Sequence, residues 1–277
     1  CPVDKLNEII DSLNIKSDGI YVDATLGYAG MSSKILEKLD KNGLLICFDQ
    51  DIDAINYSKD VLSKISNNYK IVNSNFANLK EELKKLKISK VDGIIFDLGF
   101  SSPQIDESNR GFSFMNDGNL DMRMNKESSI TASDIVNNYD LESLKKCFYE
   151  YGEEKFSRSI ARNICKFRKE KEIENTKELV EIIEKSIPKS KQTGGHPAKR
   201  TFQAIRIEVN NEIKPLEKTI EDCIDVLRPE GRLCVITFHS LEDRAVKNAF
   251  NKAKGICTCP KDLPYCVCRS KRIRKNN

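Results

Sequence analysis

The fold is decided by GIYVDATLGYAGM, residues 19–31, in which a short apolar strand runs into a turn with two glycines and then into a helix. The strand ends at Asp23, a carboxylate placed where the turn begins. Gly27 and Gly30 carry no side chain, so the backbone of the turn can approach a ligand closely. A helical spacing of apolar residues follows over residues 31–39. This order predicts the first unit of a Rossmann-like α/β fold.

The alternation of strand and helix continues along the chain. Further apolar runs have the length of buried strands, at residues 44–48, 70–73, 91–96 and 232–238. The last of them follows a long helical pattern that ends at a turn over Arg228–Gly231. Short, continuous apolar strands between helices predict a mostly parallel sheet covered on both faces.

The rhythm breaks between the fourth and fifth strands. Residues 104–125 are loop-like, with Gly, Asn and Asp between Phe and Met, and residues 131–187 have helical patterns. We therefore expect one α/β domain, formed by residues 1–106 and 209–277. A mainly helical insertion, residues 107–208, is expected to recognise the substrate.

The composition of the chain excludes several classes of protein. Hydrophobic residues make up 39% of its 277 residues, which is enough for a packed core rather than a disordered chain. Charged residues make up 32%, but the formal net charge is only +4, so a nucleic-acid surface would have to be a local patch. No run approaches the roughly 20 apolar residues that span a bilayer. The first residues, 1–5, do not resemble a signal peptide, and we expect a cytoplasmic protein without membrane contact.

Acidic residues at the strand ends indicate the type of cofactor. Ligands of open parallel sheets bind beyond the carboxyl ends of the strands, where Asp23, Asp49 and Asp97 are expected. A nicotinamide dinucleotide would need Gly-x-Gly-x-x-Gly to hold its pyrophosphate. Only Gly27-x-x-Gly30 is present, and Asp23 would repel a pyrophosphate. Asp23 can instead accept hydrogen bonds from the amino group of a methionine moiety. A tight turn without a ligand is the alternative.

Longer blocks of sequence resemble one family. The chain is similar, from its first residues to about residue 250, to the bacterial methyltransferases that methylate the 4-amino group of a cytidine in 16S ribosomal RNA. The matching blocks, in the order of the family, are DLGFSSPQ (97–104), RGFSFM (110–115), LDMRM (120–124), GEEKF (152–156), HPAKRTFQA (196–204) and FHSLEDR (238–244). Long blocks in the same order are far more specific than a glycine motif.

The resemblance implies a class I methyltransferase fold and S-adenosyl-L-methionine as the cofactor. It also implies 16S ribosomal RNA as the partner, within the small ribosomal subunit or its precursor; a homodimer is left open. It assigns cofactor binding to Ala29, Gly30, Met31, Asp49, Phe76, Asp97 and Gln104.

The chain also departs from the family. The family usually has Gly-Gly-His at residues 29–31, where this chain has Ala-Gly-Met. Backbone contacts survive this change, but a contact of the histidine side chain does not. The family's C-terminal extension, which ends in an Arg-rich strand, has no counterpart before Asn277. We therefore expect a shortened, divergent paralogue, whose fifth strand lacks its usual neighbour in the sheet.

Two residues are candidates for catalysis. The 4-amino group of cytosine is a poor nucleophile, because its lone pair conjugates with the ring. A group that accepts its hydrogens would raise the electron density on nitrogen as the new bond forms. Asp97 and the backbone carbonyls of the Leu98–Ser102 turn are the candidates for this role. His239, at the end of the fifth strand, would contact the base or move a proton. Alternatively, it is a structural histidine that fixes the turn.

The insertion carries candidate RNA contacts. Residues 187–207 contain no acid and five cations, Lys189, Lys191, Lys199, Arg200 and Arg206, which suits phosphate binding, although a solvated face is the usual alternative. His196 lies in the same loop and is expected to shape it or to touch phosphate. A second group follows the Leu98–Ser102 turn, and it would stack on an extruded base or pin the loop: Phe112, Phe114, Met115, Met122 and Arg123.

Four cysteines gather near the C-terminus, Cys257, Cys259, Cys266 and Cys268. In a cytosolic protein this spacing predicts a tetrahedral zinc site, with reduced thiols or a redox pair as alternatives. The basic tail at 269–275 would touch RNA or fray. The other cysteines lie among apolar residues and are expected to fill the core, at Cys47, Cys147, Cys165, Cys223 and Cys234.

The leading hypothesis is therefore a methyltransferase that modifies the cytidine 4-amino group of 16S ribosomal RNA. Three alternatives stay open at this point. They are a catalytically weak RNA-binding factor for ribosome assembly, a methyltransferase for another RNA, and a methyltransferase for a small molecule.

Overall fold

The computed structural model describes residues 3–192 and 194–256. The chain divides into two compact units, which are described separately. The α/β unit comprises Cys1–Gly99 and Ile213–Asn277, and the helical unit comprises Phe100–Glu212. The helical insertion thus begins at residue 100 and ends at residue 212 in the structure, several residues outside the 107–208 expected from the sequence.

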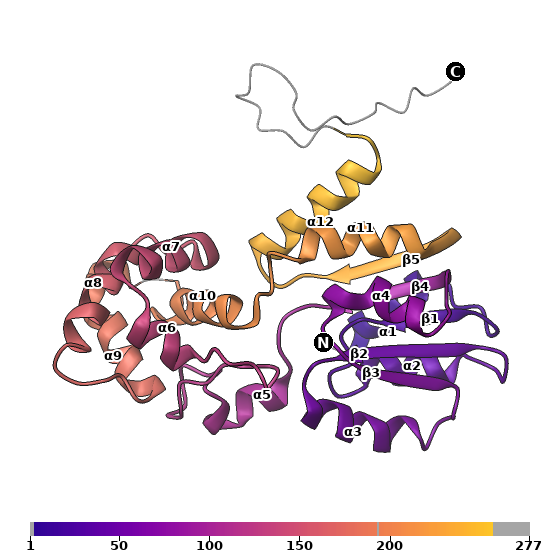
Figure 1. Cartoon of the computed structure of the whole chain (residues 1–277), viewed down its shortest axis with the longest axis horizontal. Coiled ribbons are helices and arrows are strands. Elements are labelled where there is room, and N and C mark those ends of the chain that lie inside the picture. Colours follow the sequence, from indigo (N-terminus) through magenta and orange to yellow (C-terminus); the bar gives the residue numbers. More distant parts are fainter. Residues whose placement is uncertain (1–2, 193, 257–277) are drawn as a thin grey trace. The chain divides into compact units, whose positions relative to one another are not determined.

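A five-stranded parallel sheet forms the centre of the α/β unit (Figure 1). Its order is β3-β2-β1-β4-β5. The strands are β1 (Ile20–Asp23), β2 (Leu44–Asp49), β3 (Tyr69–Asn73), β4 (Val91–Asp97) and β5 (Leu227–Ile236). This confirms the predicted Rossmann-like α/β fold. The strand order reverses between β1 and β4, and ligands of such sheets bind at the carboxyl ends beside that reversal.

Both faces of the sheet are buried, because successive side chains of a strand point to opposite faces. Val22 and Ile94 belong to one apolar core, and Tyr21 and Ile95 belong to the other. The helices of this unit are α1 (Val3–Ser12), α2 (Gly30–Glu37), α3 (Ile52–Leu62), α4 (Leu79–Lys85), α11 (Leu216–Val226) and α12 (Ser240–Ala253), with a 3₁₀ turn η1 (Phe76–Asn78). Because helices cover both faces of the sheet, the strands are continuously apolar, without an alternation of apolar and polar residues.

The strand β5 lies at an edge of the sheet and pairs with β4 among the described residues. It begins at Leu227, earlier than predicted from the sequence, and the expected turn at Arg228–Gly231 lies inside it. The register shifts there, because Val91 pairs with Leu227 and Gly93 pairs with Arg232. The extra residues form a bulge, which tolerates a proline within a sheet edge.

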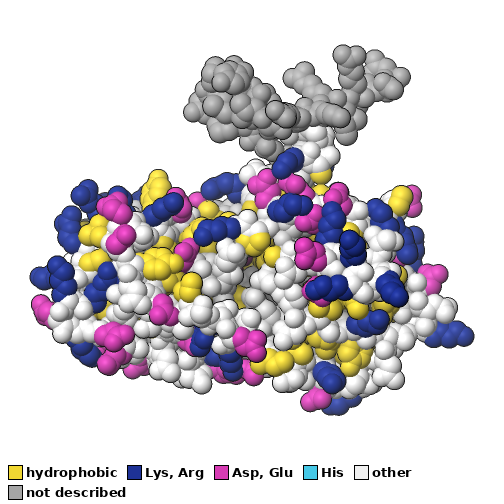
Figure 2. Space-filling view, viewed as in Figure 1, with side chains coloured by type: hydrophobic (Ala, Val, Ile, Leu, Met, Phe, Trp, Pro, Cys, Tyr) yellow, Lys and Arg dark blue, Asp and Glu magenta, His cyan; other side chains and the backbone are white. Residues whose placement is uncertain are grey.

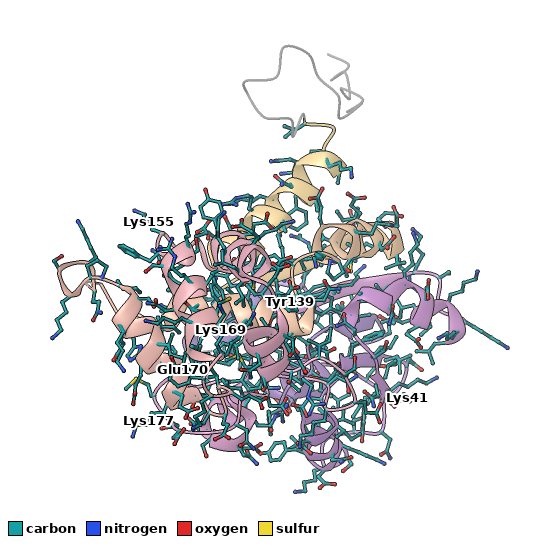
Figure 3. The ribbon with its side chains drawn as sticks, turned by 60° about the vertical axis from the view of Figure 1, so that its left-hand side comes forward. Lys41, Tyr139, Lys155, Lys169, Glu170 and Lys177 are labelled. Carbon is teal, nitrogen blue, oxygen red and sulfur yellow. The ribbon has the colours of Figure 1, made fainter. Side chains whose placement is uncertain are left out.

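The helical unit has an apolar core of its own. Its elements are α5 (Ser102–Asp106), η2 (Ser108–Arg110), α6 (Ala132–Asn138), α7 (Leu141–Gly152), α8 (Ser157–Phe167), α9 (Thr176–Ser186), η3 (Lys189–Lys191) and α10 (Lys199–Asn210). Tyr139, labelled in Figure 3, follows α6 and donates its hydroxyl hydrogen to Glu208 of α10 at 3.0 Å. Such contacts hold the helices of the unit together.

The surface carries charges of both signs, which Figure 2 shows scattered over one face of the molecule. Of the cysteines expected to fill the core, Cys47, Cys147 and Cys223 are buried free thiols, as predicted. Cys165 and Cys234 are half-buried. None of the described helices is both long enough and apolar enough to cross a membrane.

Two glycines of the helical unit allow a matched test of its packing. Gly111 and Gly194 both have positive φ, of 72° and 89°. A Cβ at Gly111 would lie 2.0 Å from Asn119 O, whereas at Gly194 it would meet nothing within 4 Å. Both substitutions, Gly111→Ala and Gly194→Ala, place an alanine at positive φ and so strain the backbone. Only Gly111→Ala also adds a steric overlap. We expect Gly111→Ala to lower the free energy of unfolding by about 1–3 kcal/mol more than Gly194→Ala does.

The measurement is denaturant unfolding followed by circular dichroism of the full chain. Equal losses in the two variants would show that the loop around Gly111 relaxes freely and contributes little to the helical unit.

Candidate cofactor and catalytic site

The turn between β1 and α2 has an unusual backbone that two neighbouring elements hold in place. Gly27 and Ala29 adopt left-handed φ values of 49° and 63°, and the second is costly for a residue with a Cβ. The N–H of Gly27 donates to Asp49 Oδ2 at 2.7 Å, and its carbonyl accepts from Ser58 Oγ at 2.7 Å. The strained turn is therefore fixed by β2 and α3 before any ligand binds.

The helix α2 begins at Gly30, whose surroundings are open. A Cβ at this residue would meet no atom within 4 Å. The neighbouring Met31 is only 6% exposed, and its side chain belongs to the core under the sheet. A ligand at this turn can therefore meet the backbone of residues 29–31, with the first unpaired N–H groups of the helix, but little of the Met31 side chain.

Asp23 is a buried acid that organises the turn. It is 1% exposed, and its two oxygens accept from Ser32 Oγ at 2.7 Å and from Thr25 N at 3.1 Å. Burial is the main reason that the pKa of Asp23 is raised to about 6; the hydrogen bonds from Ser32 and Thr25 oppose this rise, and the charges of Asp49 and Asp97 add to it. The predicted contact of this carboxylate with the amino group of a methionine moiety stays a prediction. In the structure the carboxylate bonds within the protein and joins the turn to α2.

Asp49 ends β2 and faces the same turn. Its oxygens accept from the N–H groups of Gly27 at 2.7 Å and Asp51 at 2.9 Å. Burial is the main cause of its raised pKa. The backbone of Gln50 also interacts with this carboxylate. Since a carboxylate offers about four acceptor positions, acceptor capacity is left for a hydroxyl group of a bound sugar.

Phe76 provides an aromatic surface beyond the end of β3. It begins the turn η1 and contacts Phe96 edge-on, with ring centres 5.7 Å apart. Asn75 fixes this turn, since it accepts from Ala77 N at 2.9 Å and donates to Gln50 at 3.0 Å. A half-buried ring held in this way can pack against the flat face of a heterocyclic base.

Asp97 ends β4 with one oxygen that lacks a partner. Its N–H donates to Thr25 Oγ1 at 2.7 Å, but its buried Oδ1 accepts no hydrogen bond in the structure. Burial raises the pKa of Asp97, and the carboxylate of Glu242 raises it further. An unsatisfied buried acceptor is unfavourable. This oxygen therefore marks a position that a hydrogen-bond donor or a cation would stabilise.

His239 caps the helix that follows β5. Its Nδ1 accepts from Glu242 N at 3.4 Å, while the Glu242 carboxylate accepts from Phe238 N at 2.7 Å. The two residues form a capping box. His239 Nε2 lies 3.2 Å from Glu242 Oε1, yet no well-aligned hydrogen bond joins them. The structure thus gives His239 a structural role, which was the alternative. A catalytic role stays a prediction.

Phe238 was missed in the sequence analysis. Its ring is 63% exposed and lies against Gly99, where a Cβ would be 3.4 Å from Phe238 Cδ2. An exposed ring at the carboxyl end of a strand offers a face to a planar substrate. Its position directly before His239 was the only signal in the sequence.

Several candidates in the helical unit are occupied by internal contacts. Gln104 is 6% exposed, and its Oε1 accepts from Ser101 N at 3.0 Å. Arg206 is 7% exposed, binds Glu212 through two bonds of 2.9 Å and lies 4.6 Å from the ring of Phe100. The prediction that Arg206 binds phosphate is therefore not supported by its surroundings. Lys189, Lys191, Lys199 and Arg200 are exposed.

The five candidates after the Leu98–Ser102 turn also differ in whether their side chains are buried, paired or exposed. Phe112 and Met122 are 7% and 0% exposed and belong to the core. Arg123 binds Asp121 through two side-chain bonds of 2.8 and 2.9 Å. Phe114 stacks on His196 at 4.6 Å, and His196 accepts from Ala198 N at 3.2 Å, so both shape the loop. Met115, 72% exposed, is the member still open to a substrate.

The predicted zinc ligands Cys257, Cys259, Cys266 and Cys268 lie outside the described residues. Within the described part of the chain, no group of three or more His, Cys, Asp or Glu side chains is placed to hold a metal ion.

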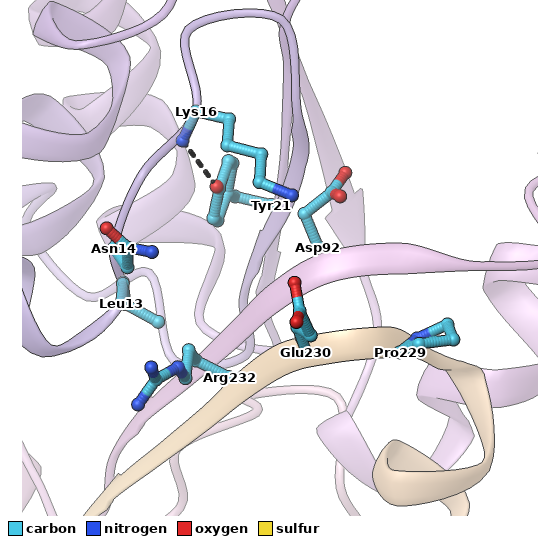
Figure 4. A pocket seen from close by; sticks show the side chains of 9 residues that line it. Leu13, Asn14, Lys16, Tyr21, Asp92, Pro229, Glu230 and Arg232 are labelled. Atoms are coloured by element: carbon cyan, nitrogen blue, oxygen red, sulfur yellow. Dashed lines mark hydrogen bonds between the residues drawn. The ribbon is translucent and has the colours of Figure 1, made fainter.

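A polar hollow of about 390 Å³ opens at the opposite end of the strands, near their amino ends (Figure 4). Tyr21 and Asp92, near the amino ends of β1 and β4, line it, and Tyr21 Oη accepts from Lys16 N at 2.7 Å. Because ligands of parallel sheets bind at the carboxyl ends of the strands, we place the candidate cofactor site at the ends that carry the three acids and not at this hollow.

Comparisons with known proteins show the family to which this chain belongs. A family model described as the MraW methylase family matches residues 4–276. The protein named Ribosomal RNA small subunit methyltransferase H from Clostridium botulinum (strain Loch Maree / Type A3) is 57% identical over 263 residues, which cover 95% of this chain and 85% of that protein. Proteins of the same name from Clostridioides difficile (strain 630) and Finegoldia magna are 52% and 50% identical. They match over 95% and 96% of this chain, and over 85% and 86% of their own lengths.

The raised pKa of Asp23 predicts how stability depends on pH. The folded state binds this proton more tightly than the unfolded state, so the contribution of Asp23 to stability is largest at low pH and falls as pH rises through about 6. The free energy of unfolding of the wild type minus that of Asp23→Asn should therefore fall by about 2 kcal/mol between pH 4.5 and pH 8.

Denaturant unfolding of both proteins across this range measures the difference, in which the other acids largely cancel. A difference that is flat with pH, or that increases, would contradict the assigned pKa.

Proposed function

Because this chain belongs to the MraW methylase family, we propose that it transfers a methyl group from S-adenosyl-L-methionine to the 4-amino group of a cytidine in 16S ribosomal RNA. The family and the names of the relatives make it a methyltransferase that depends on S-adenosyl-L-methionine and acts on ribosomal RNA. The target in the small subunit, or in its precursor, and a cytoplasmic location are part of the proposal.

The residues at the carboxyl edge of the sheet fit this cofactor. The donor carries two positive groups, a sulfonium and an ammonium, and it also carries sugar hydroxyls and an adenine ring. Asp49 has acceptor capacity left for a hydroxyl, and Phe76 offers a flat apolar surface to the ring. The backbone of residues 29–31 would meet the methionine portion, as the open surroundings of Gly30 allow. Gln104 stays a proposed contact on the basis of the resemblance alone.

The observation that carries the proposal is the unpaired, buried Oδ1 of Asp97. When bound, the cofactor supplies a methyl group on a positively charged sulfur, which is already a good leaving group. Asp97 accepts a hydrogen of the cytidine 4-amino group and so increases electron density on its nitrogen as the bond to the methyl carbon forms. After transfer the nitrogen is acidic, and the raised pKa of Asp97 suits it to receive the proton.

Other residues of the α/β unit position the reacting groups. The exposed ring of Phe238 provides a face on which the target base stacks. His239 and Glu242 hold the backbone of Phe238 through the capping box, so His239 acts as a positioning residue. Alignment of this kind accounts for much of the rate in displacement reactions.

Asp97→Asn tests the proposed acceptor directly. The amide keeps the size of the side chain but loses the negative charge, so we expect methyl transfer in a single turnover to slow by about a hundredfold or more. Asp60→Asn, an exposed acid on α3, is the matched control and should keep the wild-type rate. Methyl label transferred to isolated small subunits measures both. A rate within threefold of wild type for Asp97→Asn would remove Asp97 from the mechanism.

The nucleotide itself is tested by mass mapping of ribosomal RNA from cells with and without this gene. We expect one methylated cytidine of 16S ribosomal RNA to lose its 4-amino methyl group when the gene is absent, and to regain it when the wild-type gene is restored. Cells that receive the gene with Asp97→Asn are the control, because they contain the protein without the proposed hydrogen-bond acceptor. An unchanged methylation pattern would refute the proposed target.

A further inference from the structure

The helix α8 (Ser157–Phe167) presents a row of cations on its outer side. Arg158, Arg162 and Lys166 are spaced by four residues and are exposed, and Lys169 continues the row beyond the helix. No acid occurs between residues 155 and 169. Figure 3 labels Lys155 and Lys169, near the two ends of α8. At 1.5 Å of rise per residue, the row places a charge about every 6 Å.

The opposite side of α8 is fixed in the core of the helical unit. Ile160, Ala161 and Ile164 are each 0% exposed. Arg168 also turns inward, where it donates to Val136 O at 2.7 Å and to Tyr139 O at 2.5 Å. The cations are therefore carried on a rigid support, and their orientation does not depend on a ligand.

The four cations of the row have no acidic partner among the described residues. Other lysines of the molecule differ, because Lys171 lies 2.5 Å from Glu178, Lys218 lies 2.6 Å from Asp222 and Lys247 lies 2.7 Å from Asp243. Arg158, Arg162, Lys166 and Lys169 form no such pair. Like charges at i, i+4 repel one another, so this arrangement is unfavourable until an anion binds.

A hollow of about 550 Å³ adjoins the first turn of α8. Its lining includes Ser157 of that turn, Tyr149 of α7, the cations Lys145 and Lys146 and the acids Asp140 and Glu142. Glu142 is paired with Lys145 at 2.7 Å, and Asp140 caps α7. The ring of Tyr149 is 66% exposed. An exposed aromatic ring beside cations is the arrangement by which proteins stack an unpaired base while they hold the adjoining phosphates.

We propose that the outer side of α8, with the hollow at Tyr149, binds a single-stranded segment of the substrate RNA, with phosphates along the row of cations and a base on Tyr149. This inference rests on the proposed function and adds a binding surface for its substrate. A membrane surface is the other polyanion to consider. An amphipathic helix at a membrane inserts its apolar side, but that side of α8 is buried in the core.

The test is the salt dependence of RNA binding by the full chain. In one variant Arg158, Arg162, Lys166 and Lys169 are all changed to Gln, which keeps helix propensity. The control changes four paired lysines to Gln, with the same loss of charge, at Lys171, Lys185, Lys218 and Lys247. The probe is 16S ribosomal RNA stripped of protein, and the slope of log Kd against log salt is measured.

Each phosphate contact to a single strand contributes about 0.7 to the slope, so removal of four should lower it by about 3 and weaken binding at least about tenfold at physiological salt. The control should keep the wild-type slope. Tyr149→Ser should weaken binding with an unchanged slope, and Tyr149→Phe should restore it. Calorimetry with S-adenosyl-L-methionine should give the wild-type Kd for every variant, which shows that the α/β unit is intact.

An unchanged slope and affinity in the α8 variant would overturn this inference, even when the wild type methylates RNA. Failure of the wild type to methylate small subunits would overturn the proposed function instead. Loss of binding to vesicles of anionic phospholipid, with RNA binding preserved, would assign α8 to a membrane and would also overturn the inference.

Discussion

Three carboxylates are held largely out of water at the carboxyl ends of neighbouring parallel strands, and the proposed cofactor site depends on this constraint. The fold imposes it, because the carboxyl ends of β1, β2 and β4 lie side by side. Asp23 and Asp49 are stabilised by hydrogen bonds from the turn and from α2, whereas Asp97 keeps an unpaired oxygen. The raised pKa values of all three express one fact: the protein alone does not fully compensate these charges.

The strained turn follows from the same constraint. The N–H of Gly27 donates to Asp49, and the chain then passes through the left-handed conformations of Gly27 and Ala29 before α2 begins. Ala29 adopts this conformation against the preference of its Cβ. Where the family usually has glycine, this chain thus keeps the backbone geometry at a cost in strain. At residue 31 the chain has methionine where the resemblance leads us to expect histidine. The Met31 side chain lies in the core, so only its backbone is left to contact a ligand.

The sequence predicted the elements whose signal is local, and it failed where a side chain's role depends on a distant partner. Strand ends and their acids follow from apolar runs that stop at a polar residue, so the sheet and Asp97 could be predicted. Arg206 could not be assigned, because Glu212 and Phe100 decide its environment. The sequence around Phe112 does not indicate whether its ring is buried or exposed. The row on α8 was not identified from the sequence, and the helix shows that its cations share one exposed side.

The acids also bear on the direction of the reaction. A cluster of partly uncompensated carboxylates favours a ligand with positive charge, and the methyl donor has a sulfonium that its product lacks. In the proposed reaction, the positive charge would pass with the methyl group to the nitrogen of the base and would leave that nitrogen as a proton. In the proposed mechanism Asp97 receives that proton, and the raised pKa of its carboxyl group suits it to this role. A protonated Asp97 and a neutral thioether attract each other less than the initial pair. The charge arrangement that holds the donor therefore weakens once the donor is used.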